Sequence, residues 1–223
     1  AYKVLESNEI EPTSWNELQT LTKEELRKWV DAMDAEMESM KAKDVWELSD
    51  LPEKVTPVDT KWVFKLKRDE NGKVTQHKAR LVARGFTQKP GEDFTEIFAP
   101  VANNATLRVL LSVAGAKRMM VRHLDVKTAF LNGELKETVY INQPKGYVLN
   151  GNEDKVYRLK KGLYGLKQAA KTWNDKLDGI LKSNGYHRNE VDPCLYMKRE
   201  TDGICYILVY VDDIILCTNL PKL

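Results

Sequence analysis

Two adjacent carboxylates inside an apolar strand are the residues best suited to chemistry in this sequence. Asp212 and Asp213 interrupt the apolar stretch that runs from Ile204 to Cys217. Burying unpaired charges is costly, and two like charges side by side cost more. A tight turn at a sheet edge that binds a divalent cation removes this cost, because Mg²⁺ prefers hard oxygen ligands. The alternative is an ordinary Asp-Asp hairpin turn, but the apolar flanks without Gly or Asn favour a metal site.

Asp125 is the candidate for a third carboxylate. It follows a predicted strand over residues 121–124 and precedes Val126-Lys127. Phosphoryl transfer with two metal ions uses groups that bind both ions, which lie ~3.5–4 Å apart. An Asp at the end of a neighbouring strand can do this beside the Asp-Asp turn. The alternative is that Asp125 caps a helical turn over residues 127–131.

A basic segment lies between Lys61 and Lys89. It contains nine Lys or Arg residues against Asp69 and Glu70, although the whole chain carries a net charge of only +2. Such a patch attracts phosphates. The alternative, equally open on charge alone, is a solvated hairpin face.

The elements that must position these residues can be predicted from capping, periodicity and turn signals. Thr22 with Glu25 forms a capping box that opens an amphipathic helix. Residues 61–67 alternate as a strand, Asn71-Gly72 is a hairpin turn signal, and the return strand is predicted over about 74–86. A short buried helix follows around residues 107–114.

The second half of the sequence predicts a sheet with helices. The expected elements are a strand ending near 125, a strand at 139–141, a helix from 163 to 184 that stops at Gly185, and a hairpin of 194–198 with 204–211 that turns at Asp202-Gly203. This order predicts an α+β fold with a mixed sheet and helices on one face.

Composition limits the class of protein. The 223 residues are 42% hydrophobic and 30% charged, as in a soluble globular protein. The three cysteines give no disulfide framework and are expected as buried thiols in a reducing compartment, and the histidines lack zinc-ligand spacing. The eight-residue apolar run at 204–211 cannot span a bilayer, so no membrane partner is expected. Because the chain begins with Ala1, we expect a piece of a longer polypeptide.

Seven stretches in a fixed order carry a family resemblance. They are Lys61-Trp-Val-Phe-Lys65, Lys78-Ala-Arg-Leu-Val-Ala-Arg-Gly-Phe86, Phe98-Ala-Pro-Val101, Leu124-Asp-Val-Lys-Thr-Ala-Phe-Leu-Asn-Gly133, Gln143-Pro144, Leu163-Tyr-Gly-Leu-Lys-Gln-Ala169 and Tyr210-Val-Asp-Asp213. With these motifs the sequence resembles the reverse transcriptase domain of copia-type (Pseudoviridae) retrotransposon polyproteins. Ile97, His123-Leu124 and Ala170 depart from the family pattern, and none of them is an expected metal ligand.

The resemblance implies RNA-directed DNA polymerase activity on a right-hand fold. The implied fold is α+β, with fingers and palm, a mixed or antiparallel palm sheet packed on helices, and no thumb. Asp125, Asp212 and Asp213 are the implied catalytic and metal-binding residues, for two Mg²⁺ ions that Mn²⁺ can replace. The implied reaction joins a primer 3′-OH to the α-phosphate of a dNTP.

Substrate contacts follow by position. Phe130 would lie beneath the sugar and exclude a 2′-OH, or else be a core residue. The triphosphate candidates in the basic hairpin are Lys65, Lys78 and Arg80. Tyr164, Gly165 and Lys167 would open the long helix and contact nucleotide and template, although Tyr164 could equally be a core aromatic.

The expected organisation has three regions: a polar lead-in over 1–21, a fingers-like region over 22–119 with the basic hairpin at 61–86, and a truncated palm over 120–223 from which 145–170 return to the fingers. Expected partners are an RNA or DNA template with primer, dNTPs, and the rest of the Pol polyprotein with integrase, thumb and RNase H. The expected location is intracellular, in a cytoplasmic virus-like particle, the nucleus or both. The alternatives are a truncated, non-catalytic remnant with residual nucleic-acid binding and an unrelated two-metal nuclease.

Overall fold

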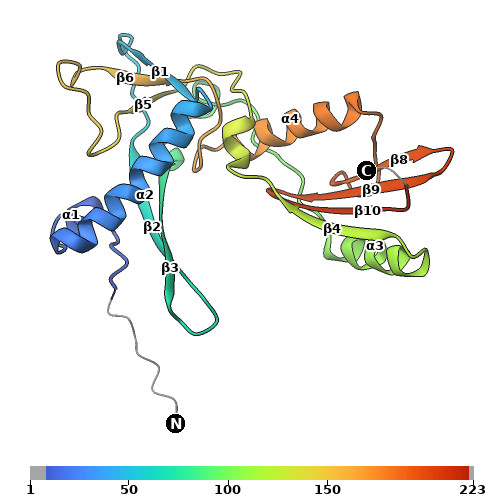
Figure 1. Ribbon diagram of the computed structural model, residues 1–223. Helices are drawn as coiled ribbons and strands as arrows, with labels where there is room; N and C mark the ends of the chain where they lie inside the picture. The colour runs from blue at the N-terminus through green and yellow to red at the C-terminus, as the bar shows by residue number, and fades with distance from the viewer. Residues whose placement is uncertain (1–8, 221–223) are drawn as a thin grey trace. The chain divides into compact units, whose positions relative to one another are not determined.

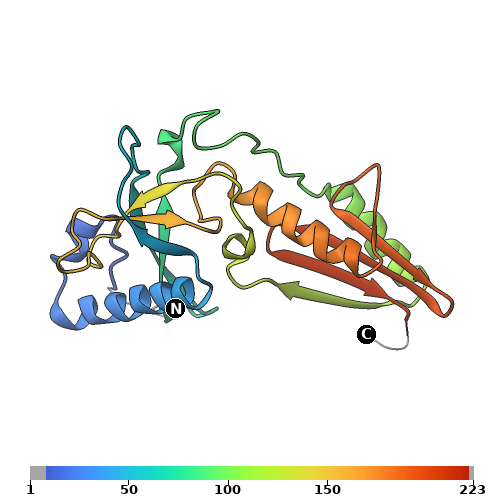
Figure 2. The same cartoon turned by 90° about the horizontal axis from the view of Figure 1, so that it is seen from above.

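The computed structural model describes residues 9–220, which divide into two compact units (Figures 1 and 2). The hairpin unit contains residues 9–95 and 135–167, and the sheet unit contains residues 96–134 and 168–220. Helix α3 belongs to the sheet unit although it precedes residue 120. The fingers and palm regions stay predictions, because compactness does not test what a region does.

The hairpin unit contains two α-helices, a two-stranded hairpin and a small sheet. Its elements are α1 (Trp15–Leu18), α2 (Lys23–Ala42), β1 (Trp46–Ser49), β2 (Thr60–Arg68), β3 (Val74–Ala83), the 3₁₀ turn η1 (Gly85–Thr87), β5 (Tyr140–Asn142) and β6 (Val156–Leu159). Strands β2 and β3 form the hairpin, and β1, β6 and β5 form a three-stranded antiparallel sheet in that order.

Alternation along β2 separates a buried face from a basic face. Thr60, Trp62, Phe64 and Leu66 are buried, and the residues between them are exposed. Helix α2 packs along the hairpin, where Trp29 meets Phe64 edge to face with ring centroids 5.2 Å apart (Figure 1). The predicted capping box at Thr22 and the hairpin turn at Asn71-Gly72 are both confirmed.

Two details of this unit differ from the prediction. The return strand ends at Ala83, and residues 85–87 form a 3₁₀ turn. The predicted lead-in over 1–21 contains α1, whose Leu18 is fully buried. Residues 1–8 of that lead-in lie outside the described residues.

The sheet unit is a five-stranded antiparallel sheet with two helices. Its elements are α3 (Asn104–Ala116), β4 (Met120–Asp125), the 3₁₀ turn η2 (Ala129–Asn132), α4 (Ala169–Ser183), β7 (His187–Arg188), β8 (Leu195–Glu200), β9 (Gly203–Tyr210) and β10 (Asp213–Thr218). The strand order is β4-β10-β9-β8-β7, which leaves β4 at an edge. The predicted α+β class is confirmed, with antiparallel pairing between all the named strands of residues 9–220.

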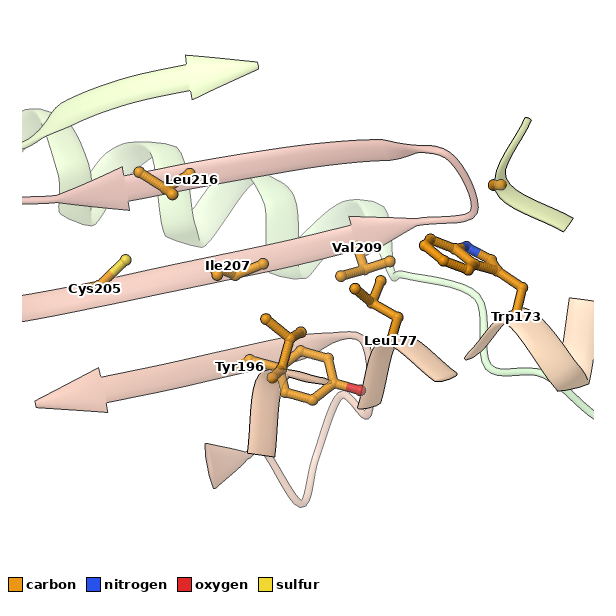
Figure 3. Packing of buried hydrophobic residues seen from close by; sticks show 9 residues of the cluster. Trp173, Leu177, Tyr196, Cys205, Ile207, Val209 and Leu216 are labelled. Atoms are coloured by element: carbon orange, nitrogen blue, oxygen red, sulfur yellow. The ribbon is translucent and has the colours of Figure 1, made fainter. Parts of the chain in front are cut away.

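Both faces of this sheet are covered, one by each helix. Alternate residues of β9 and β10 pack with α4 on one face, in the cluster drawn in Figure 3: Trp173, Leu177, Tyr196, Cys205, Ile207, Val209 and Leu216. The strand residues between them, Ile204, Leu208 and Cys217, pack on the other face with Leu110 and Ala114 of α3. The prediction of helices on one face is therefore wrong. The near-continuous apolar run of β9 is the pattern of a strand buried on both sides.

The start of α4 also differs from the prediction. The helix begins at Ala169, not at Leu163, and it stops before Gly185, which has φ +81°. Residues 163–168 form an irregular segment in which Gly165 has φ +91°. A left-handed glycine is incompatible with the first turn of an α-helix.

The three cysteines are buried free thiols, as predicted. Burial raises the pKa of the Cys194 thiol to about 11. Within residues 9–220, no helix is both long enough and apolar enough to cross a membrane.

Candidate active site

A two-residue hairpin turn between β9 and β10 contains Asp212 and is followed directly by Asp213. Tyr210 pairs with Asp213, so Val211 and Asp212 are the two loop residues. Val211 has φ +55°, a conformation that β-branched residues rarely adopt. Two-residue turns with a positive φ at the first central position alone normally have Gly there. The turn is therefore strained, which is a common property of functional sites.

A tryptophan of α4 holds this strained turn. The indole Nε1–H of Trp173 donates a 2.7 Å hydrogen bond to the carbonyl of Val211. Trp173 is itself buried in the cluster between α4 and the sheet (Figure 3). The turn is thus fixed to the packed core rather than left as a free loop tip.

Strand register brings Asp125 to the same end of the sheet. Asp213 pairs directly with Asp125 across β10 and β4, and the amide of Val126 donates a 2.9 Å hydrogen bond to the carbonyl of Asp212. Directly opposed residues in an antiparallel pair project from the same face, with Cβ atoms ~4.5–5.5 Å apart. The backbone therefore brings Asp125 to the Asp212-Asp213 pair, which lies far from it in the sequence.

One of these carboxylates already has a partner. The Nε2 atom of His123 lies 2.7 Å from Oδ1 of Asp213. His123 is two residues before Asp125 on β4, so both side chains project from the same face of the sheet. Sequence reasoning noted His123 only as a departure from the family pattern, and its contact could not be found without the register.

The donor set fits a hard divalent cation, although it is not assembled as a cage. Asp125 is exposed and Asp212 and Asp213 are half-buried, so the oxygens can be reached by a substrate. Among residues 9–220, no three His, Cys, Asp or Glu side chains are arranged to hold a metal ion. Carboxylate oxygens are the ligands that Mg²⁺ prefers, but the Asp213 carboxylate is turned toward His123.

Phe130 lies on the turn η2 that follows β4. It is half-buried and packs against the cluster formed by α4 and the sheet. The turn begins after Thr128, which has φ +54°, and it is pressed onto α4, since a Cβ on Gly133 would lie 2.6 Å from the backbone of Thr172. Phe130 thus shares in the core and keeps part of its ring accessible.

The basic candidates lie on one face of the β2–β3 hairpin. Lys65 is opposite Lys78, and Arg80 is opposite Val63, so the three side chains project from the exposed face. Lys65 forms a 2.9 Å ion pair with Glu11, whose carboxylate also accepts from the amide of Leu66. These cations belong to the hairpin unit and the carboxylates to the sheet unit.

Tyr164 and Gly165 lie beside the end of β3. The amide of Ala83 donates to the carbonyl of Tyr164 at 2.8 Å, and the guanidinium of Arg80 lies 5.9 Å from the centroid of the Tyr164 ring. A Cβ on Gly165 would lie 2.2 Å from the carbonyl oxygen of Ala83. This close approach explains why glycine stands at 165.

Lys167 is fixed through a buried glutamine. Its amide donates a 2.8 Å hydrogen bond to Oε1 of Gln88, which is 6% exposed. Gln88 was missed by sequence reasoning, because a lone polar residue in a polar loop gives no signal. Trp173 lies in the helix predicted over 163–184, but no role at the carboxylates was predicted for it.

A family comparison agrees with the sequence motifs. The model of the family described as "Reverse transcriptase (RNA-dependent DNA polymerase)" matches residues 43–222. The matched range contains all ten predicted site residues: Lys65, Lys78, Arg80, Asp125, Phe130, Tyr164, Gly165, Lys167, Asp212 and Asp213.

Similar proteins are polyproteins of transposons. The chain is 44% identical over 214 residues to the "Retrovirus-related Pol polyprotein from transposon TNT 1-94" of Nicotiana tabacum, covering 96% of this chain and 16% of that protein. It is 38% identical over 197 residues to the Pol polyprotein from transposon RE1 of Arabidopsis thaliana, covering 88% and 13%. It is 30% identical over 200 residues to the "Truncated transposon Ty1-A Gag-Pol polyprotein" of Saccharomyces cerevisiae, covering 86% and 16%. The chain therefore spans about a sixth or less of the length of these relatives.

Proposed function

Because this chain belongs to the reverse transcriptase (RNA-dependent DNA polymerase) family, as the reverse transcriptase domain of a copia-type retrotransposon Pol polyprotein, we propose that it adds deoxynucleotides to a primer on an RNA or DNA template. One observation carries the proposal. The register pairs Asp125 with Asp213, and the Asp212 carbonyl accepts from the amide of Val126. This supports the proposal, because nucleotidyl transfer with two metal ions uses carboxylates as shared ligands.

Asp125 and Asp212 would bind the catalytic cations directly, and Asp213 would support them. When bound, two Mg²⁺ ions, or Mn²⁺ in their place, supply an activated primer 3′-hydroxyl and neutralise charge on the phosphates. The protein's own contribution is to hold the carboxylates in place. The Trp173 bond to Val211 does this for the turn, and the His123 contact restrains Asp213.

The basic face of the hairpin would bind the triphosphate of the incoming dNTP. Arg80 suits bidentate phosphate contact, while Lys65 and Lys78 act as point charges. Because Lys65 is paired with Glu11, that carboxylate must be displaced before Lys65 contacts phosphate. The Lys65 side chain is 71% exposed, so loss of its ion pair with Glu11 costs ~0–1 kcal/mol.

Phe130 would select the sugar, and the 164–167 segment would contact base and template. A flat ring beneath the ribose leaves no room for a 2′-OH. Arg80 lies over the Tyr164 ring, so this contact connects the proposed triphosphate ligands with the 164–167 segment. Gly165 would present its backbone to the template strand, and Lys167 its charge.

We assign the fingers role to the hairpin unit and the palm role to the sheet unit. The partners proposed for the whole protein are primer-template, dNTPs, and the integrase, thumb and RNase H parts of a Pol polyprotein. We place the activity in the cell, in a cytoplasmic virus-like particle, the nucleus or both.

Primer extension on poly(rA)·oligo(dT) with Mg²⁺ tests this function. It should be measured on the 223-residue chain and on the longer Pol segment that contains it. Asp212→Asn removes a ligand charge with little change in volume, and extension should fall by more than ~10²-fold, since even outer-shell partners of a metal cost ~10–100-fold. Asp202→Asn is the matched control, because Asp202 lies at the β8–β9 turn, and it should leave extension unchanged.

Three outcomes would contradict the proposal. Full activity of Asp212→Asn would remove the carboxylate assignment. No extension by either wild-type protein would favour a non-catalytic remnant, and cleavage of nucleic acid without dNTPs would favour a nuclease.

A further inference from the structure

A cavity in the hairpin unit is lined by the C-terminal half of α2 and by aromatic residues of the small sheet. Its volume is about 380 Å³, within the ~300–1,000 Å³ range of ligand pockets. The residues that line it come from α2, the turn that follows it, β1 and β6, all in one compact unit: Asp34, Met37, Glu38, Met40, Lys41, Asp44, Val45, Trp46 and Tyr157. The proposed polymerase site uses none of these residues.

The lining of this cavity is acidic, with three carboxylates against one lysine among the described residues. Asp44 is paired with Lys160 at 3.0 Å. Asp34 accepts a 2.5 Å hydrogen bond from the Tyr147 hydroxyl, and Glu38 has no ion-pair partner within residues 9–220. Asp34 and Glu38 are four residues apart on α2, a spacing at which like charges repel each other. The cavity therefore favours a cation and disfavours a phosphate.

Two stacked aromatic rings form another part of the lining. Trp46 on β1 and Tyr157 on β6 have ring centroids 4.8 Å apart and ring planes at 15°. The register of the two strands places them diagonally on one face of the small sheet. Trp46 is half-buried, so part of its ring stays accessible. The face of a tryptophan ring attracts cations, which agrees with the charge of the cavity.

The hydroxyl of Tyr157 is an unused polar group at this cavity. Tyr157 is 7% exposed, and its hydroxyl has no hydrogen-bond partner among residues 9–220. Buried polar groups normally have such a partner. In the described part of the chain, Glu9 Oε2 is the one fully buried side-chain oxygen or nitrogen without a partner, so the Tyr157 hydroxyl still reaches solvent. A ligand in the cavity that donates a hydrogen bond would satisfy this hydroxyl.

We propose that this cavity binds the guanidinium of an arginine side chain presented by a peptide segment of a partner protein. A guanidinium is planar, stacks on aromatic rings and pairs with carboxylates through several N–H donors. It would stack on Trp46 and donate to the Tyr157 hydroxyl. Its charge would offset the repulsion between Asp34 and Glu38. Such binding needs no polymerase activity, and the acidic lining separates it from contacts to nucleic acid.

NMR spectra of the 223-residue chain, labelled on the methionine methyl groups, test this site. Met37 and Met40 line the cavity, whereas Met119, Met120 and Met197 belong to the sheet unit and serve as internal controls. The probes are N-acetylated, C-amidated tripeptides with arginine, lysine or citrulline between two glycines. Citrulline keeps the shape of arginine without its charge. The arginine peptide should shift the Met37 and Met40 signals saturably, and the other two should bind at least ~10-fold more weakly.

Two substitutions test the side chains that recognise the guanidinium. Glu38→Gln removes the charge with little change in volume and should weaken binding of the arginine peptide ~2–5-fold. Glu24→Gln, the same change in the first turn of α2, is the control and should leave binding unchanged. Tyr157→Phe removes the hydroxyl and keeps the ring. It should weaken binding ~2–10-fold without lowering the melting temperature, because no hydrogen bond among the described residues is lost.

Several results would overturn the proposal. Citrulline or lysine peptides that bind as tightly as the arginine peptide would remove the guanidinium from the site. Unchanged binding by both Glu38→Gln and Tyr157→Phe, or an equal loss in Glu24→Gln, would remove the cavity. Met37 and Met40 signals that change with protein concentration alone would assign this face to a second copy of the chain. Selective binding of the arginine peptide by a protein without primer extension would support the proposal, even though the polymerase function had failed.

Discussion

The bond from Trp173 to the strained turn gives the sharpest test of how the carboxylates are positioned. Trp173→Phe keeps an aromatic ring in the core but removes the 2.7 Å hydrogen bond to the Val211 carbonyl. Losing one such bond costs ~0.5–1.5 kcal/mol, and an unsatisfied carbonyl costs ~1–3 kcal/mol. The smaller ring adds a cavity term, so we expect the free energy of unfolding to fall by ~2–3 kcal/mol.

A double-mutant cycle separates the turn from the cavity. Val211→Gly removes the conformational strain of a β-branched residue at φ +55°, so a turn with Gly needs the Trp173 bond less. The cavity term is the same in both backgrounds. Trp173→Phe should therefore cost less in the Val211→Gly background, with a coupling energy of ~0.5–1.5 kcal/mol.

Urea unfolding followed by far-ultraviolet circular dichroism measures the cycle, since Trp173 fluorescence is lost in the variant. Primer extension measures its effect on function. A misplacement of ~1 Å at reacting groups costs ~10²-fold in rate, so Trp173→Phe should lower kcat far more than its folded fraction falls. Strict additivity of the two substitutions, together with unchanged kcat, would refute the role of Trp173 as the support of the turn.

Three further predictions test other parts of the structure. Gly165→Ala should lower the free energy of unfolding by ~2–4 kcal/mol in thermal melts, because the new Cβ would lie 2.2 Å from the carbonyl oxygen of Ala83. Gly91→Ala is the control: it has open space around it and should cost only ~1 kcal/mol. Phe130→Ala should increase ribonucleotide incorporation at least ~10-fold in extension assays, while Phe98→Ala, at a 72% exposed ring, should not. Burial raises the pKa of Glu36, so the folded protein binds this proton more tightly than the unfolded chain does. The free energy of unfolding therefore falls as pH rises through that pKa. Glu36→Gln should stabilise the protein by ~1 kcal/mol at pH 8 and not at pH 4, as measured by urea unfolding.

Local signals predicted the parts of the fold that local chemistry determines. The Thr22 capping box and the Asn71-Gly72 turn each depend on a few neighbouring residues, and each was found as predicted. The β8–β9 turn predicted at Asp202-Gly203 was found one residue earlier, at Thr201-Asp202, because Gly203 pairs with Glu200. The position of Asp125 at the end of a strand beside the Asp-Asp turn depends on hydrophobic pattern and was also found. Its role as a metal ligand stays a prediction.

The errors arose where distant backbone contacts decide the structure. Leu163 and Leu166 continue the helical stripe of α4, but Gly165 must adopt φ +91° to lie against Ala83. The hydrogen bond that the Lys167 amide donates to Gln88 then keeps residues 163–168 out of the helix. Such contacts join residues some 80 positions apart in sequence, about which periodicity carries no information. The covering of both sheet faces, in contrast, was readable in the apolar run at 204–211 and was missed.

That apolar run raises the question of what fixes the register on which the carboxylates depend. A one-residue slip normally exposes apolar side chains and is thereby excluded. Strand β9 is apolar on both faces, so alternation alone discriminates weakly between alignments of β9 with β10, and a slip would move Asp212 and Asp213 out of position at the turn that β9 and β10 form. Polar contacts at both ends of the hairpin supply the missing specificity.

At the far end, Ile204 donates its amide to Asn219 Oδ1 at 2.8 Å, and its carbonyl accepts from the buried Thr218 hydroxyl at 3.2 Å. At the near end, the two-residue turn and the Trp173 bond to Val211 allow one alignment. A slip would break these bonds and leave buried polar groups unpaired, at ~1–3 kcal/mol for each. These contacts set the alignment of β9 with β10 and so the position of the Asp-Asp turn. The alignment of β10 with β4 is supported instead by the bond from the Val126 amide to the Asp212 carbonyl and by the contact of His123 with Asp213.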